Sequence, residues 1–187
     1  MTTGSPRFVR TARPAGQGGF TLIELLIVVA MISVLATIAF PILLRARITS
    51  NEGVAVAALR TIHSAEAAFA STCGAGGYAQ TLDDLAKKPV GSTVGFITDP
   101  FSTNGVIVNG YEASVMAANG ANTQLVAANT CNGAAADAVT AFVAERHARS
   151  VGETGVRSFA IDTQGTMYMR QDGVTIGNAL AGTVVFK

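Results

Sequence analysis

The chain has 187 residues, enough for one modest domain and an additional segment. Apolar residues make up 49% of the chain and charged residues 13%, about half the share of a typical soluble domain, so part of the chain is expected to avoid water. Residues 1–19 contain three arginines and no acid; removing these three charges from the formal net charge of +1 leaves residues 20–187 at −2. Such a weakly acidic protein lacks the concentrated basic face of a nucleic-acid-binding protein, so nucleic acid is not an expected partner.

Residues 1–19 are rich in Thr, Ser, Gly, Pro and Arg and contain no apolar core, so they are expected to form a targeting leader that is removed. An ordinary secretory signal is cut after its apolar segment. Here the change in composition comes before the apolar segment, at Gly19 and Phe20. The bond between these two residues is therefore the expected end of the leader.

The following 25 residues, 20–44, carry one charge, Glu24. As a helix this segment would be about 38 Å long, enough to cross an apolar layer of about 30 Å, so we expect a membrane-spanning helix. The leader arginines predict a cytoplasmic N-terminus and an exported C-terminal part. Arg45 and Arg47 at the other end of the helix weakly oppose this orientation, but the leader carries more positive charge.

Two residues within the apolar segment need a physical explanation. Glu24 either lies shallow enough to reach water or has a cationic partner. Cleavage before Phe20 would create such a cation, because it leaves a new α-amino group four residues from Glu24, on the same chain or on a neighbouring copy. Pro41 removes a backbone donor and is expected to kink or loosen the helix around residues 37–40, where Thr37 could satisfy a freed carbonyl. A proline that a membrane helix simply tolerates is the alternative.

The segment GFTLIELLIVV, which begins at Gly19, resembles the prepilin signature of type IV pilins and type II secretion pseudopilins. In that family a membrane-embedded aspartyl peptidase cuts after the glycine and N-methylates the new first residue. The resemblance therefore implies a cleavage between Gly19 and Phe20 and methylation of Phe20. The acid at the fifth mature position corresponds to Glu24, which would set the register of assembly, and the family proline corresponds to Pro41. One departure is Ser33, where many pilins have glycine.

This resemblance, which is dense over residues 18–45, implies a structural subunit of a type IV pilus-like filament. No set of catalytic residues stands at a suggestive spacing in the sequence, so neither an enzyme nor a cofactor is expected. The implied partners are prepilin peptidase, other copies of the chain, minor pilins and the inner-membrane assembly machinery. The subunit would wait in the inner membrane, with its head in the periplasm, before joining an extracellular pilus. A periplasmic pseudopilus is the alternative within the family. A single-pass membrane-anchored binding or sensor domain would explain the apolar segment, but not the Gly-Phe junction or Glu24.

After Pro41 the helix is expected to continue to Thr72, because residues 45–72 contain strong helix formers and no proline. An apolar stripe at helical spacing should pack this half of the helix on a globular domain. The stripe consists of Ala55, Ala58, Leu59, Ile62, Ala65 and Phe69. The polar complement consists of Arg45, Arg47, Glu52, Arg60 and Glu66.

The remaining residues, 73–187, are expected to form the globular head. A short helix is predicted from Thr81 to Lys88, with Thr81 as its N-cap and two solvated acids, Asp83 and Asp84, in its first turn. Strands are predicted at residues 111–117, 138–145, 157–161 and 166–170, with a hairpin turn across residues 162–165. The predicted fold class is α+β: a long N-terminal helix, half transmembrane and half amphipathic, packed on a small antiparallel β-sheet, as in the pilin fold.

The two cysteines, Cys73 and Cys131, have no His or further Cys at the spacing of a metal site, so no metal is expected. In an oxidising compartment they would form one disulfide, which would close a loop of about 58 residues and contribute roughly 4 kcal/mol. Two buried free thiols are the alternative. The sequence GAGGYA after Cys73 matches a dinucleotide-binding pattern on paper, but it follows a helix instead of a strand, so we reject that site.

Overall fold

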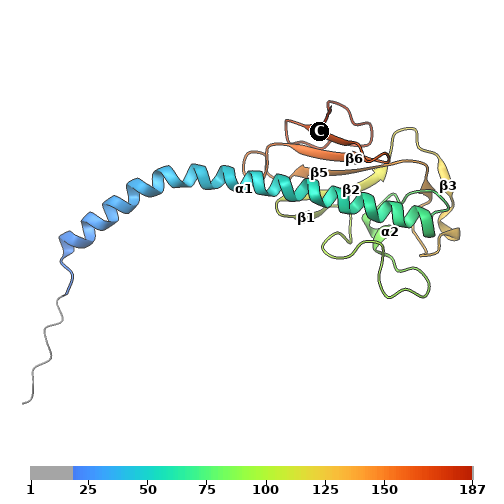
Figure 1. The fold of residues 1–187 in the computed structure, drawn as a ribbon, viewed down its shortest axis with the longest axis horizontal. Coiled ribbons are helices and arrows are strands. Elements are labelled where there is room, and N and C mark those ends of the chain that lie inside the picture. The colour runs from blue at the N-terminus through green and yellow to red at the C-terminus, as the bar shows by residue number, and fades with distance from the viewer. Residues whose placement is uncertain (1–18, 187) are drawn as a thin grey trace, which may run out of the picture. The chain divides into compact units, whose positions relative to one another are not determined.

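The computed structural model describes residues 19–186, and the chain divides into two units after Pro41. The predicted leader, residues 1–19, lies outside the described residues except for Gly19. Helix α1, Leu22–Thr72, begins in the N-terminal unit and ends in the unit that contains the β-sheet (Figure 1). It ends at the residue where the sequence predicts its end.

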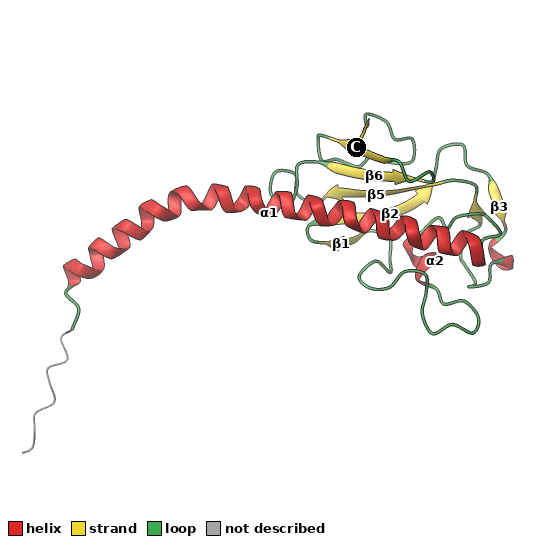
Figure 2. Cartoon of the chain, viewed as in Figure 1, coloured by secondary structure: helices red, strands yellow, loops and turns green. Residues whose placement is uncertain are grey.

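Six strands form the main sheet, in the order β1-β2-β5-β6-β7-β8, and every neighbouring pair is antiparallel. These strands are β1 Val106–Val108, β2 Tyr111–Ala117, β5 Phe142–Ala148, β6 Ser158–Asp162, β7 Met167–Arg170 and β8 Val184–Val185. A second sheet pairs β3 with β4, and two short helices lie in the connections; their bounds are β3 Thr123–Leu125, β4 Ala138–Val139, α2 Leu82–Ala86 and η1 Ala127–Asn129. The second part of α1 lies along one face of the main sheet (Figure 2). This arrangement confirms the predicted α+β class.

The apolar stripe of α1 packs on the sheet as predicted. Ala55, Leu59, Ile62 and Phe69 are each at most 1% exposed. They share one core with inward-facing residues of three strands, Tyr111, Ala113, Val115, Phe142, Ala144, Phe159 and Ile161. Because the stripe residues are three or four positions apart, they project from one side of the helix and bury it against the head.

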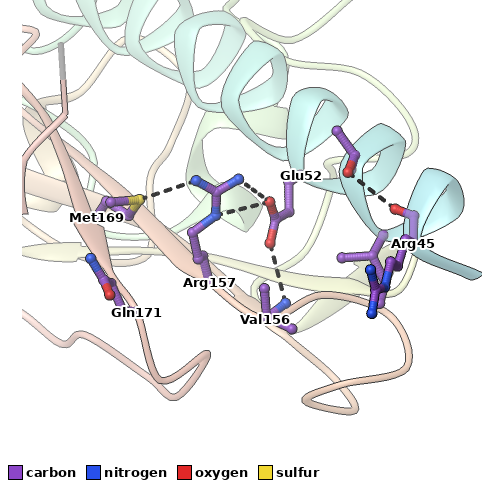
Figure 3. Close-up of a pocket in the computed structure, with 8 residues that line it drawn as sticks. Arg45, Glu52, Val156, Arg157, Met169 and Gln171 are labelled. Carbon is purple, nitrogen blue, oxygen red and sulfur yellow. Dashed lines mark hydrogen bonds and ion pairs between the residues drawn. The ribbon is translucent and has the colours of Figure 1, made fainter.

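Two acids of α1 also lie on this packed side, and their assignment to the polar complement is wrong. Glu52 is 4% exposed and Glu66 is fully buried. The Glu52 carboxylate accepts hydrogen bonds from Arg157 Nε at 2.9 Å, from Arg157 Nη2 and from the Val156 N–H at 3.2 Å (Figure 3). Glu66 Oε2 accepts one from the Ala79 N–H at 2.8 Å. Burial of these acids depends on donors supplied by the head, which the helix sequence alone does not reveal.

The short helix α2 begins as predicted, since Thr81 Oγ1 accepts a hydrogen bond from the Asp84 N–H at 3.1 Å. Asp83 is exposed, but Asp84 is 1% exposed, so the prediction of two solvated acids is wrong for Asp84. The Asp84 carboxylate accepts from the Ala135 N–H at 2.6 Å and from Lys87 Nζ at 2.9 Å. Burial alone would raise the pKa of Asp84, but these donors outweigh it and the pKa is lowered. Asp84 thus attaches the loop before β4 to α2.

Strands β2, β6 and β7 lie within one residue of their predicted positions. The predicted hairpin joins β6 to β7, with the Gly165 N–H donating to Asp162 O at 3.0 Å and a φ of +79° at Gly165, which glycine adopts readily. The predicted strand 138–145 is wrong in extent, because the chain leaves the small sheet after Val139 and enters the main sheet at Phe142. Strands β1, β3 and β8 were not predicted, since two or three residues carry no recognisable periodicity.

A disulfide joins Cys73 to Cys131, with their Cα atoms 4.7 Å apart. Cys73 directly follows the last residue of α1, and Cys131 lies in the connection between η1 and β4. The bond therefore ties the C-terminal end of the long helix to a loop of the head that is 58 residues away in sequence.

The burial of Glu66 predicts an unusual pH dependence. Burial raises the pKa of this carboxyl well above its usual value, although the Ala79 N–H opposes the shift. A carboxyl with a raised pKa in the folded state stabilises the fold most at low pH, and that contribution is lost as the pH rises above about 4.3. Glu66→Gln keeps an acceptor for Ala79 and does not titrate, so its free energy of unfolding should rise relative to wild type as the pH increases.

Denaturant unfolding of the full chain in detergent, between about pH 4 and about pH 8, measures this difference. Glu66→Ala serves as the contrasting variant and should be about 1–3 kcal/mol less stable than Glu66→Gln, because the buried Ala79 N–H loses its acceptor. A constant difference between Glu66→Gln and wild type across the pH range would contradict the raised pKa.

Candidate processing and assembly site

The junction that the sequence predicts as a cleavage site lies immediately before α1. Gly19 and Phe20 are exposed and outside the helix, and the Phe20 side chain is 85% exposed. A Cβ atom built at Gly19 meets no heavy atom within 4 Å. No steric contact with the described residues therefore requires a glycine at this position.

Helix α1 begins with a cap that the sequence analysis missed. The Glu24 N–H donates to Thr21 Oγ1 at 3.2 Å, and the Leu25 N–H donates to Thr21 O at 3.3 Å. The Thr-x-x-Glu spacing is that of a capping box, and this spacing was the available sequence signal. The cap starts the helix directly after the junction and places Glu24 in the first turn, near the positive end of the helix dipole.

The apolar segment of α1 is exposed along its length. Its large apolar residues from Leu22 to Leu44 are between 36% and 81% exposed, and the most apolar window of the helix contains no buried residue. The helix is long and apolar enough to cross a membrane. An exposed apolar surface of this extent is typical of a segment that lipid or another protein covers.

Polar side chains within the segment bond to the helix itself. Ser33 Oγ donates to Val29 O at 2.8 Å, and Thr37 Oγ1 donates to Ser33 O at 2.9 Å. Both hydroxyls are thus satisfied without a partner outside the helix. The helix continues through Pro41, and the Thr37 hydroxyl bonds to Ser33 O instead of the carbonyl that the proline leaves without a donor. The kink at Pro41 stays a prediction.

Glu24 is exposed, and it forms no ion pair with another residue in the range 19–186. The described residues of one uncleaved copy therefore do not supply its predicted cationic partner. Gly19, Phe20 and Glu24 lie together at the start of one helix, whereas Cys73 and Cys131 lie at the other end of that helix.

The head contains a charged cluster that sequence spacing did not reveal. His147 on β5 lies between Glu145 Oε1 at 3.5 Å and Glu112 Oε2 at 3.7 Å, and Glu145 raises the pKa of His147 against the effect of burial. Glu145 Oε2 also accepts from the N–H groups of Ile176 and Gly177, at 2.8 and 2.7 Å. The cluster thus holds the loop after β7 on the sheet, and within the described residues no group of three His, Cys, Asp or Glu side chains could hold a metal ion.

Residues 14–40 match the prokaryotic N-terminal methylation motif, the signature of type IV pilins and pseudopilins. This match confirms the resemblance to the prepilin signature that the segment beginning at Gly19 shows. It includes the junction, Glu24 and most of the apolar segment, and it includes no residue of the head. No curated protein and no solved structure matches the chain.

The cap at Thr21 leads to a specific expectation. Thr21→Ala should weaken the first turn of α1 by about 1 kcal/mol, which corresponds to roughly fivefold faster amide exchange at Glu24 and Leu25. Thr21→Ser keeps an oxygen that can accept the Glu24 N–H and should exchange like wild type. Hydrogen exchange followed by NMR on the full chain in detergent micelles compares the three proteins, and equal rates in all of them would contradict the cap.

Proposed function

We propose that this chain is a structural subunit of a type IV pilus-like filament, made as a precursor that prepilin peptidase cleaves between Gly19 and Phe20. One observation carries the proposal: an exposed junction, the Glu24 carboxylate and an exposed apolar helix follow one another within a single matched motif. A methylation motif of this kind marks a type IV pilin- or pseudopilin-like precursor.

Cleavage hydrolyses the amide between Gly19 and Phe20. Water adds to the carbonyl carbon, so the leader leaves with a new carboxylate and the subunit keeps a new α-amino group on Phe20. The exposed, non-helical backbone before the capped helix suits this step, because a peptidase can bind the junction without unfolding α1. N-methylation of that amine leaves the nitrogen basic, so the positive charge persists.

The new ammonium would supply a cationic partner for Glu24, which forms no ion pair within residues 19–186. An unpaired carboxylate is costly among apolar helices, and a neighbouring subunit that supplies the ammonium removes most of that cost. The pair forms at only one axial offset between two helices, so it would set the register of the filament. Repetition of the same head-to-tail contact without closure produces an open helical polymer.

Before assembly, the apolar segment would anchor the subunit in the inner membrane, with a cytoplasmic N-terminus and a periplasmic head. Assembly machinery would then move the helix from lipid into a bundle of like helices, which keeps it away from water throughout. Other copies of the chain and minor pilins would be its partners in the filament. The same features fit a type II secretion pseudopilin, and mass spectrometry of filaments sheared from cells distinguishes a surface pilus from a periplasmic one.

Substitution of Glu24 tests the assembly step. Glu24→Ala should still be cleaved and methylated, because the junction stays intact, but it should yield at least about tenfold less sheared filament, since the ammonium loses its partner. Glu153→Ala is the matched control, because Glu153 is an exposed acid of the head, and it should assemble normally. Wild-type filament yield from Glu24→Ala would contradict the register role.

Substitution of Gly19 tests the cleavage step separately. Gly19→Phe should leave the full-length precursor in the membrane, and Gly19→Ala should be cut more slowly than wild type. Gly19 is exposed and lies outside α1, and no atom of the described residues comes within 4 Å of an added Cβ, so a defect reports on recognition by the peptidase. Immunoblots of membrane fractions resolve precursor from mature protein, and mature-sized Gly19→Phe would disprove the assigned cut.

A further inference from the structure

A groove opens between α1 and the neighbouring strands at the end of the head where the apolar segment stops (Figure 3). Its volume is about 480 Å³. The side chains that line it and bear on its chemistry are Arg45, Ile48 and Thr49 of α1 and Val156, Arg157 and Met169 of the sheet side. A second hollow of about 260 Å³ shares Thr49, Glu52 and Arg157 with this groove, and its lining also includes Phe159 and Phe186.

The groove has a defined place relative to the apolar segment. Arg45 follows Leu44, the last residue of that segment, and Ile48 comes one helical turn later. At 1.5 Å per residue, the lining of the groove begins within about 6 Å of the end of the segment along the helix axis. When the segment lies in a bilayer, this is the depth of the lipid headgroups.

The two arginines of the groove differ in their charge balance. Arg157 binds the buried Glu52 carboxylate through Nε and Nη2, so its charge is compensated. Arg45 is exposed and forms no ion pair with another described residue. One uncompensated guanidinium therefore lies at the groove, and guanidinium is the side-chain group best shaped for phosphate.

The polar side chains of the lining other than Arg45 are Thr49, Gln171 and the paired Glu52 and Arg157, and the rest of the lining is apolar. Ile48 and Met169 are partly exposed, and Val156 is 41% exposed. A free phosphate ion would gain nothing from these side chains. A phospholipid would gain from contact with them, because the carbon atoms of its glycerol and upper acyl chains adjoin the phosphate.

We propose that, in the membrane-anchored subunit, this groove binds the headgroup of an anionic phospholipid. Arg45 donates to the phosphate, and Ile48 and Met169 contact the glycerol and the upper acyl chain. The inference rests on the membrane anchoring in the proposed function. Such a lipid would hold the head against the membrane surface until the subunit is extracted, when the lipid is released.

Native mass spectrometry of the full chain in detergent, with added phosphatidylglycerol or phosphatidylcholine, tests the site. We expect one phosphatidylglycerol per chain to be retained in preference to phosphatidylcholine, and Arg45→Gln to weaken that retention about tenfold. Arg47→Gln is the matched control. It removes the same charge from the same helical turn but does not line the groove, so it should leave retention unchanged.

Equal losses for Arg45→Gln and Arg47→Gln would show a general surface attraction and overturn the groove, as would equal retention of the two lipids. Glycerol phosphate that competes as well as phosphatidylglycerol would overturn the lipid as the ligand. If Arg45→Gln abolished filaments but kept its lipid, the groove would be a contact between subunits, and the lipid assignment would be wrong.

Cleavage and filament yield are measured separately from lipid retention. Failure of lipid binding would therefore leave the proposed function unaffected, and failure of assembly would leave the lipid result unaffected.

Discussion

The exposure of the apolar half of α1 is the constraint from which the other features follow. Burial of each large aliphatic side chain is worth about 1.5–3 kcal/mol, and the segment from Leu22 to Leu44 exposes many of them. A segment of this kind is stable where lipid or other apolar helices surround it. The proposed cleavage before Phe20 would add a charge next to Glu24 and would thereby change which surroundings suit the start of this helix.

The other half of the same helix is held by the head, and it is held by more than apolar contact. Leu59, Ile62 and Phe69 fill the core, while Glu52 and Glu66 are buried at two heights along the same side of the helix. A buried acid with donors in one geometry penalises any rotation or sliding of the helix, which an apolar stripe alone would tolerate. We interpret these acids as the contacts that specify how the head sits on its helix.

The sequence predicted those parts of the fold and of the candidate site that depend on neighbours in the chain. The junction at Gly19 and the placement of Glu24 are visible because an abrupt change in composition marks them. The cap at Thr21 also depends only on neighbouring residues, and the Thr-x-x-Glu spacing in the sequence indicates it, but it was not among the predicted features. Burial of Asp84 was out of reach, because its donor at Ala135 lies in a loop about fifty residues later in the chain.

The sequence by itself therefore determined the long helix, its division into an exposed apolar half and a packed half, and the position of the methylation motif, since periodicity and composition act over a few residues. Only the tertiary structure decided which acids of that helix are buried, where the strand predicted at residues 138–145 changes sheets, and that Arg45 borders a groove with the sheet. These outcomes depend on hydrogen-bond donors and packing surfaces that come from distant parts of the chain. The free-energy cost of burying a polar side chain is set mainly by whether such a partner is present.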